Sequence, residues 1–144
     1  MIDSIKYDQT GAYLPPGADA DRDGMPDSWE YLYSDDITAA ESGGDADGDG
    51  ATNLEEFVAD TDPTNRSSVL ELEKIESGVG NAVMIHVPDT SPQRLYTLNE
   101  SIDLGIVDSW EAVGTGMVGN DATLVFPHTG AYPRTLYRVT VALP

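Results

Sequence analysis

The sequence predicts a small module of two acidic loop–helix units, followed by an all-β antiparallel sandwich. Three observations support this fold class. A twelve-residue acidic pattern occurs twice, at 19–30 and at 45–56. A run rich in Asp, Pro, Thr, Asn and Ser then breaks the chain at 61–68. Beyond this break, short segments rich in β-branched and aromatic residues alternate with Gly, Pro, Asp and Ser, which is typical of strands joined by turns.

These observations divide the chain into three regions. We expect an N-terminal linker at 1–18, the tandem loop–helix module at 19–66 and the β-sandwich at 67–144. The linker ends in "YLPPGA", a stiff and turn-forming sequence. Residues 1–66 carry seventeen acidic and three basic side chains, a net charge of −14, whereas the remainder carries nine and four, a net charge of −5. This asymmetry is typical of an acidic, ion-binding segment joined to an ordinary domain.

Each acidic loop leads into a short helix. The first helix begins at Pro26, which suits a first helical turn, and runs through "PDSWEYLY"; the second reads "TNLEEFVAD". In both, three apolar residues recur at i, i+3, i+4 spacing and form one face. These residues are Trp29, Leu32 and Tyr33 in the first helix, and Leu54, Phe57 and Val58 in the second. Because neither helix is long enough to be stable alone, we expect the two faces to pack on each other.

The β region contains five segments with strand composition. They are 68–75, 81–87, 94–100, 121–126 and 135–143, and one or two further strands are expected within 104–118. Six or seven short strands in a region of this length predict a small antiparallel sandwich.

The acidic loops have the chemistry of a site for a hard divalent cation. Such a cation prefers six to eight oxygens at ~2.3–2.6 Å, and short acids at alternate positions can converge if the chain wraps around it. A glycine at position 6 permits the bend, position 7 offers a backbone carbonyl, and a glutamate at position 12 has the length for a bidentate contact. The predicted ligands are Asp19, Asp21, Asp23, Met25, Asp27 and Glu30 in the first loop, and Asp45, Asp47, Asp49, Ala51, Asn53 and Glu56 in the second.

Both loops match the pattern D-x-[DN]-x-[DN]-G-x₅-E of an EF-hand calcium loop at every fixed position. We therefore predict two Ca²⁺ ions per chain. Mg²⁺ is a weaker competitor because it demands octahedral geometry and keeps its waters. The alternative is a pair of solvated acidic turns. Asp60 and Asp62 are possible additional ligands, although Asp62 also suits a turn before Pro63. Asp35 and Asp36 fit a solvated connection.

The two units are half EF-hands, because neither "GAYLPPGA" nor "DITAAESGG" can supply a helix entering the loop. The segment "DADRDGMPDSWE…DADGDGATNLEEFVADTDPTNRSS" resembles the thrombospondin type 3-like calcium repeats and related dockerin loops of bacterial extracellular proteins. The strand "LYRVTV" at 136–141 is similar to one in the C-terminal β domains that follow such segments. The resemblance implies a calcium-binding spacer in a secreted or cell-surface bacterial protein. Unlike thrombospondin repeats, the chain has no cysteine.

The net charge of the chain limits the classes of partner that it can bind. A net charge of −19 argues against nucleic acid and anionic lipid surfaces, both of which would be repelled. No stretch approaches the ~20 apolar residues of a membrane span. We expect an excised part of a larger parent chain, located extracellularly or at the cell surface, whose partners are calcium and the other domains of that chain.

No constellation in the sequence predicts an active site, and we expect the chain not to be an enzyme. His86 and His128 lie far apart, and neither a phosphate-binding loop nor a nucleophile elbow is present. The alternative to a structural or adhesive role is a β domain that recognises a glycan or protein, with calcium as scaffold. Aromatic residues that could form a sugar-stacking platform, or equally the sandwich core, are Tyr96, Trp110, Tyr132 and Tyr137. An intracellular calcium buffer is a third and more distant hypothesis.

Overall fold

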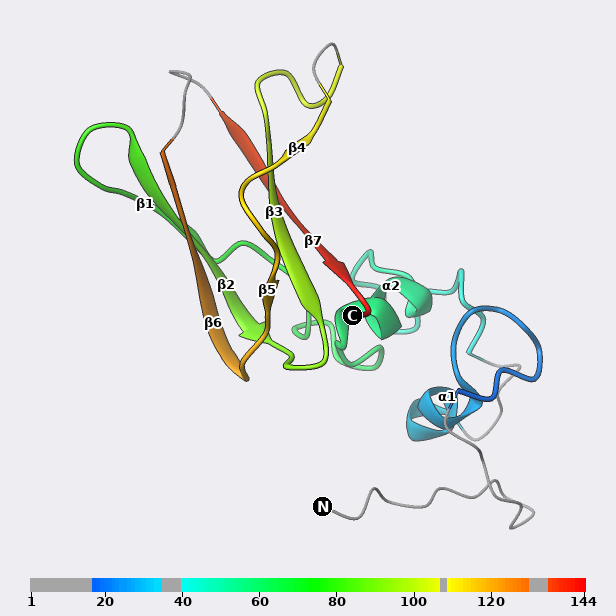
Figure 1. Ribbon diagram of the computed structural model, residues 1–144. Helices are drawn as coiled ribbons and strands as arrows, with labels where there is room; N and C mark the ends of the chain where they lie inside the picture. The colour runs from blue at the N-terminus through cyan, green and yellow to red at the C-terminus, as the bar shows by residue number, and fades with distance from the viewer. Residues whose placement is uncertain (1–16, 35–39, 107–108, 130–134) are drawn as a thin grey trace. The chain divides into compact units, whose positions relative to one another are not determined.

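The computed structural model describes residues 17–34, 40–106, 109–129 and 135–144 (Figure 1). The chain divides into two compact units. The first comprises Met1–Phe57 and Thr61–Val69, and the second comprises Val58–Asp60 and Leu70–Pro144. Almost all of the expected linker at 1–18 lies outside the described residues, as do Asp35 and Asp36.

Two short helices follow the acidic loops, as the sequence predicts. Helix α1 spans Asp27–Tyr33 and helix α2 spans Asn53–Ala59. In the first unit the ring of Trp29 lies 5.0 Å from that of Tyr33 and meets the ring of Phe57 edge-on at 5.6 Å. The expected contact between the two apolar faces is therefore confirmed through these aromatic rings.

One residue of the predicted apolar face on α1, Leu32, is not buried. Its side chain is 56 % exposed, whereas Trp29 is buried. The aromatic contact runs along the i, i+4 row from Trp29 to Tyr33, and the i+3 position lies to one side of that row. The buried face of this two-turn helix is therefore narrower than the i, i+3, i+4 spacing of its apolar residues suggests.

The two helices begin differently. Pro26 precedes α1 in an extended conformation and makes no side-chain hydrogen bond to cap it. In contrast, α2 begins with a capping box: the N–H of Thr52 donates to a carboxylate oxygen of Glu55 at 2.8 Å, and the N–H of Glu55 donates to the Thr52 hydroxyl at 3.3 Å. The hydrogen bonds that the N–H and the hydroxyl of Thr52 donate to the Glu55 carboxylate, both 2.8 Å, lower the pKa of Glu55.

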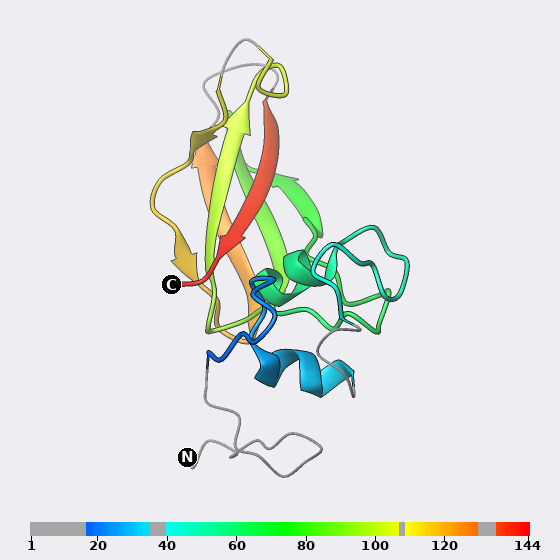
Figure 2. The same ribbon diagram turned by 90° about the vertical axis from the view of Figure 1, so that its right-hand side faces the viewer.

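The second unit contains two antiparallel sheets (Figures 1 and 2). One sheet has the order β1–β2–β6, and in the other β3 pairs with β4, β5 and β7. The strands are β1 Lys74–Ser77, β2 Ala82–Thr90, β3 Leu95–Ser101, β4 Glu111–Ala112, β5 Met117–Val118, β6 Ala122–Thr129 and β7 Leu136–Ala142. Described β strands thus occur in every predicted segment, and β4 and β5 lie in the 104–118 region.

The inward faces of the two sheets share one apolar core, as expected for a sandwich. Its buried residues are Ile85, Val87, Tyr96, Leu98, Leu124 and Phe126. They follow the alternation of the strands: in β2, Ile85 and Val87 are buried, whereas Met84 is exposed. Burying each such side chain contributes about 1.5–3 kcal/mol, so this core is the main source of the unit's stability.

The first predicted strand begins later than its composition suggests. The sequence predicts a strand over 68–75, but β1 starts at Lys74. Leu70 and Leu72 are half-buried against the core without joining the ladder, and just before β1 the Glu73 N–H donates to the His86 carbonyl of β2 at 2.9 Å. The alternation of Leu70 and Leu72 with polar residues is therefore due to packing against the core and not to pairing with a neighbouring strand.

Arg94 holds the Val58–Asp60 segment within the second unit. It is only 5 % exposed, its Nε–H donates to the Val58 carbonyl at 2.7 Å, and its Nη2 lies 3.5 Å from the Asp60 carboxylate. A buried guanidinium that satisfies a helix carbonyl is difficult to replace, because its removal leaves the acceptor unpaired.

We therefore expect Arg94→Met to destabilise the second unit by about 2 kcal/mol, the usual value for a hydrogen bond involving a charged group. Amide hydrogen exchange at the buried strand residues Ile85 and Leu98 would measure the loss. Arg138→Met is the matched control, since Arg138 is exposed and lies 4.5 Å above the Trp110 ring, a contact worth about 0.5–1 kcal/mol. Equal effects of the two substitutions would contradict the role given to Arg94.

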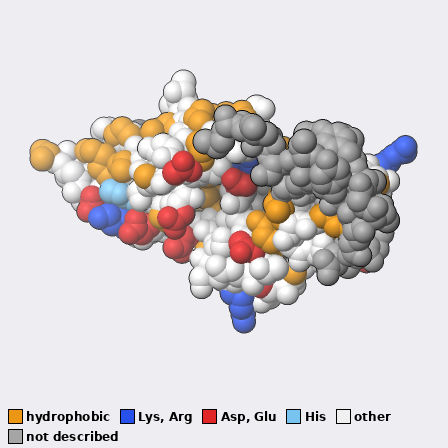
Figure 3. Space-filling view, turned by 90° about the horizontal axis from the view of Figure 1, so that it is seen from below, with side chains coloured by type: hydrophobic (Ala, Val, Ile, Leu, Met, Phe, Trp, Pro, Cys, Tyr) orange, Lys and Arg blue, Asp and Glu red, His pale blue; other side chains and the backbone are white. Residues whose placement is uncertain are grey.

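Acidic side chains are spread over the face drawn in Figure 3, with lysine and arginine at only a few points, in keeping with the formal net charge of −19. Among the described residues, no helix has the length and apolar character needed to cross a membrane.

Candidate metal centres

The first acidic loop brings three carboxylates together. Asp19, Asp21 and Asp23 each present an oxygen within 4.8 Å of the others. Backbone groups close the loop, because Asp19 accepts hydrogen bonds from the N–H of Arg22 at 2.6 Å and of Gly24 at 3.2 Å. Gly24 has φ 99°, a conformation that residues with a Cβ rarely adopt. The bend therefore lies at position 6, where the pattern places it.

The second loop has the same arrangement. Asp45, Asp47 and Asp49 present oxygens within 4.8 Å of one another. Asp45 accepts hydrogen bonds from the N–H of Gly48 at 2.7 Å and of Gly50 at 3.1 Å, and Gly50 has φ 107°. Two segments with the same residue pattern thus adopt the same carboxylate-lined turn.

Each helix presents a buried glutamate at position 12. The exposed fraction is 0 % for Glu30 and 1 % for Glu56. Within the described residues, neither carboxylate oxygen of Glu30 has a hydrogen-bond partner, nor does Oε2 of Glu56. The other oxygen of Glu56 accepts a long hydrogen bond, 3.4 Å, from the Thr61 hydroxyl. A buried carboxylate without a partner is costly, so these oxygens require a positive charge or a proton.

Unpaired buried oxygens concentrate at the predicted ligand positions. In the described part of the chain, the buried side-chain atoms without a partner belong, with one exception, to residues of these two loops. They are Asp23 Oδ2, both Glu30 oxygens, Asp47 Oδ2, Asp49 Oδ2, Asn53 Oδ1 and Glu56 Oε2, and the exception is Thr135 Oγ1. Solvated acidic turns would direct such oxygens to water. This distribution favours the interpretation of the loops as cation sites.

The two glutamates are held in an environment that penalises negative charge. The pKa of Glu30 is raised to about 7 by burial and then by the repulsion of neighbouring carboxylates, chiefly those of Asp21 and Asp23. Burial followed by repulsion from the second loop's aspartates raises the pKa of Glu56 to about 7 as well. Each glutamate is therefore near enough to the three aspartates of its own loop to be repelled by them, and its use as a ligand together with them stays a prediction.

These pKa values predict how the metal-free unit responds to pH. Since the pKa values of Glu30 and Glu56 are about 7 in the folded unit and 4.5 ordinarily, the folded state binds protons that the unfolded chain releases between pH 4.5 and 7. The free energy of unfolding must then rise as pH falls through 7. We expect metal-free protein, prepared on a chelating resin, to melt at a higher temperature at pH 5.5 than at pH 8. Melting that is independent of pH, or that has the opposite trend, would contradict this electrostatic description.

The remaining predicted ligands occupy positions 7 and 9. Met25 and Ala51 donate their N–H groups to Asp23 and Asp49, at 2.9 and 2.7 Å, and the use of their carbonyls as ligands stays a prediction. At position 9 the loops differ. One Asp27 oxygen accepts a hydrogen bond from the N–H of Ala20 at 2.8 Å.

In the second loop, the side-chain amide of the residue at position 9, Asn53, makes a hydrogen bond. Asn53 donates from Nδ2 to the Glu41 carbonyl at 2.9 Å, and its Oδ1 is one of the unpaired buried atoms. This hydrogen bond fixes the orientation of the amide, so the oxygen is available as a ligand.

Asp60 and Asp62, the possible additional ligands, have other contacts. Asp60 pairs with Arg94 in the second unit. Asp62 accepts hydrogen bonds from the N–H and the hydroxyl of Thr64, at 3.0 and 2.7 Å, which form the turn that its place before Pro63 suggests.

Two supports of the second loop were not predicted from the sequence. The capping box of Thr52 and Glu55 has a recognisable signature, T-x-x-E before an apolar residue, and could have been found. The hydrogen bond from Arg66 Nη2 to the Gly48 carbonyl, 2.6 Å, joins residues eighteen apart and has no local signal.

In the second unit, the aromatic and histidine residues considered for recognition or catalysis have structural contacts. Tyr96 is buried in the core, where its hydroxyl accepts the Ser91 N–H at 2.9 Å, so it cannot serve as an exposed stacking platform. His86 and His128 each contact a glutamate, Glu76 at 3.1 Å and Glu100 at 2.9 Å. Tyr132 lies outside the described residues.

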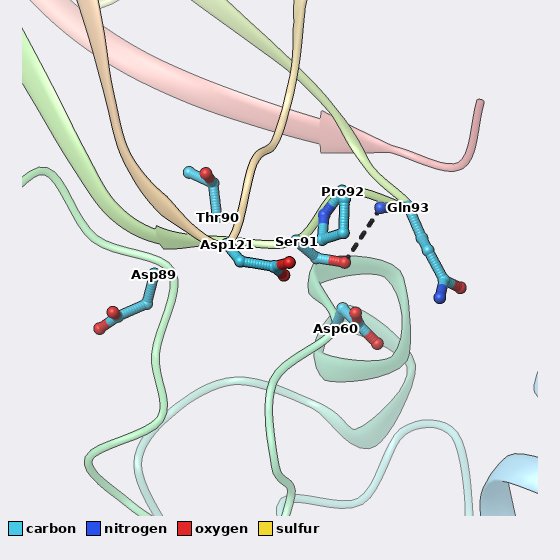
Figure 4. A pocket seen from close by; sticks show the side chains of 7 residues that line it. All are labelled: Asp60, Asp89, Thr90, Ser91, Pro92, Gln93 and Asp121. Atoms are coloured by element: carbon cyan, nitrogen blue, oxygen red, sulfur yellow. Dashed lines mark hydrogen bonds between the residues drawn. The ribbon is translucent and has the colours of Figure 1, made fainter. Parts of the chain in front are cut away.

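A polar pocket of about 550 Å³ lies in the second unit. Its lining residues are Asp60, Asp89, Thr90, Ser91, Pro92, Gln93 and Asp121 (Figure 4). The Asp89 carboxylate is turned away from those of Asp60 and Asp121, so the three acids do not converge as those of the loops do.

Comparisons of the chain with family models, curated proteins and solved structures find no match. The case for a function therefore depends on the residues and geometry of the two loops.

Proposed function

We propose that the chain is a non-catalytic, calcium-binding structural or adhesive module of a secreted or cell-surface bacterial protein. Each loop holds one Ca²⁺, and the ions stiffen a spacer that presents the β domain. The observation that carries this proposal is the pair of buried glutamates, Glu30 and Glu56, which have unpaired buried oxygens and whose pKa values are raised by burial and by the clustered aspartates of the same loop.

The donor set favours calcium over other cations. Each loop offers three aspartates, a long glutamate, a backbone carbonyl and the residue at position 9, all of them oxygen donors. Ca²⁺ accepts six to eight oxygens in a flexible geometry, whereas Mg²⁺ retains several waters and requires an octahedron. With no cysteine in the chain, thiolate sites for softer metals are excluded.

The energetics favour a constitutive structural role. A unit of roughly 60 residues buries little surface, and its clustered carboxylates oppose folding. Calcium binding to the folded unit alone adds RT ln(1 + [L]/Kd), about 4 kcal/mol per site at a thousandfold excess over Kd. Extracellular modules work with calcium dissociation constants of about 10⁻⁴–10⁻³ M or tighter, so such sites would be filled outside cells. The ions then act as permanent parts of the spacer, and the partners are the other domains of the parent chain.

Isothermal titration calorimetry tests the proposal. We expect two Ca²⁺ per chain, with Mg²⁺ at the same concentration as the matched control giving much weaker binding. Absence of calcium binding, or equal affinity for Mg²⁺, would overturn the proposal.

A further inference from the structure

The two loops share one residue pattern but differ in backbone strain. At position 4 the second loop has Gly48, with φ 75°, whereas the first has Arg22, with φ 65°. A residue with a Cβ is disfavoured in this left-handed region by about tenfold in an equilibrium constant, and glycine is not. Closing the first loop around an ion therefore works against a strain that the second loop avoids.

The second loop is also held by groups that lie beside it. Its exit helix begins with the capping box of Thr52 and Glu55, whereas α1 has no side-chain cap. Before the loop, the Glu41 carbonyl accepts a hydrogen bond from Asn53 Nδ2 at 2.9 Å. The backbone bond from the N–H of position 9 to the carbonyl just before the loop, 2.7 Å, occurs in both loops and does not distinguish them. The capping box and the side-chain hydrogen bond of Asn53 fix both ends of the second loop, so that less conformational entropy remains to be lost when an ion binds.

Arg66 adds a constraint from a distant part of the same unit. Its Nη2 donates to the Gly48 carbonyl at 2.6 Å, at the position where the chain turns. Because the Arg66 side chain is exposed, its charge is screened by solvent, and its main effect on the loop is through this hydrogen bond.

One difference favours the first loop. It carries Asp27 at position 9 and thus five carboxylates, where the second loop has Asn53 and four. The additional carboxylate attracts a cation, but it also raises the repulsion around the buried Glu30. One of its oxygens already accepts the Ala20 N–H. Affinity in such loops depends on rigidity as well as ligand charge, and the supports described above all favour the second loop.

We propose that the second loop is the stronger calcium site and fills first, with the first loop closing at higher calcium. This inference rests on the proposed function and adds an order of binding to it. The cap, the side-chain hydrogen bond of Asn53, Gly48 and Arg66 make the second loop preformed, so it provides a folded support for the packing of Trp29 against Phe57.

A calcium titration of the native chain, followed by NMR of two glycine amides, tests this order. The N–H of Gly24 donates to Asp19 and that of Gly50 to Asp45, so each amide reports on its own loop. We expect the Gly50 signal to reach half-completion at a calcium concentration about tenfold below that for Gly24. Simultaneous or reversed responses would overturn the proposed order. If neither signal responds to calcium, the proposed function itself fails.

Substitutions at position 4 test the cause. Arg22→Gly removes the strain from the first loop, and Arg22→Ala is its matched control, because both remove the charge but only alanine keeps a Cβ. We expect the glycine variant to bind calcium at the first loop three- to tenfold more tightly than the alanine variant. Gly48→Ala should weaken the second loop by a similar factor, since a Cβ there meets no atom within 4 Å and only the backbone is strained. Identical affinities of the two Arg22 variants, together with an unaffected Gly48→Ala, would remove backbone strain as the cause.

Discussion

Removing calcium is expected to destabilise the first unit strongly while the second keeps its stability. A unit of about 60 residues has a total stability of about 3–9 kcal/mol, and two sites with a dissociation constant of about 10⁻⁴ M supply about 1.4 kcal/mol each at a tenfold excess of calcium over Kd. Loss of both contributions leaves Glu30 and Glu56 as buried acids beside aspartates, with no cation to offset them. The second unit has its own apolar core between the two sheets and does not depend on the ions.

Tryptophan fluorescence can follow the first unit separately. The chain contains two tryptophans, Trp29 in the first unit and Trp110 in the second, so Trp110→Phe leaves Trp29 as the reporter. We expect thermal melts at pH 8 to show a midpoint about 10–20 °C lower in chelator than in millimolar calcium, given about 4–8 °C per kcal/mol for a small domain. A midpoint that is the same in calcium and in chelator would show that the ions do not stabilise the unit.

Replacing either buried glutamate by glutamine is expected to have opposite effects with and without calcium. Glu30→Gln and Glu56→Gln each remove a charged ligand, and we expect the affinity of that loop to fall by about 3 kcal/mol, more than a hundredfold. Without calcium the same change removes a buried charge that nothing pairs, so the variant should melt higher than the unsubstituted chain at pH 8.

Glu41→Gln is the matched control for these variants. Glu41 is exposed and also lies in the first unit, outside the predicted ligand set, so its substitution changes the net charge by the same amount. We expect little change in melting under either condition. If Glu30→Gln and Glu56→Gln resemble Glu41→Gln, the two glutamates are not ligands.

The elements that were predicted from the sequence are those specified by local patterns. The acidic repeats define where the two turns bend, because only a glycine easily adopts the φ values of Gly24 and Gly50. The alternation of polar and apolar residues in 135–143 likewise predicts β7, whose side chains alternate between exposed and half-buried.

What the sequence did not predict depends on contacts between distant residues. The hydrogen bonds of Arg66 to Gly48 and of Arg94 to Val58 join residues eighteen and thirty-six apart and have no periodic signal. The late start of β1 has a related cause, because Leu70 and Leu72 alternate as in a strand but pack on the core without a partner strand. Patterns of residue type thus indicate which faces are buried. Tertiary contacts determine whether a buried segment pairs as a strand or packs without a partner strand.

A crystal structure determined from calcium-saturated protein would test the central claim most directly. We predict two ions, one in each loop. Each should be bound by oxygens of its three aspartates and by both oxygens of Glu30 or Glu56 at about 2.3–2.6 Å, confirmed by anomalous scattering. Glutamate side chains that stay unliganded in saturating calcium, or ions bound only at other places on the acidic surface, would contradict it.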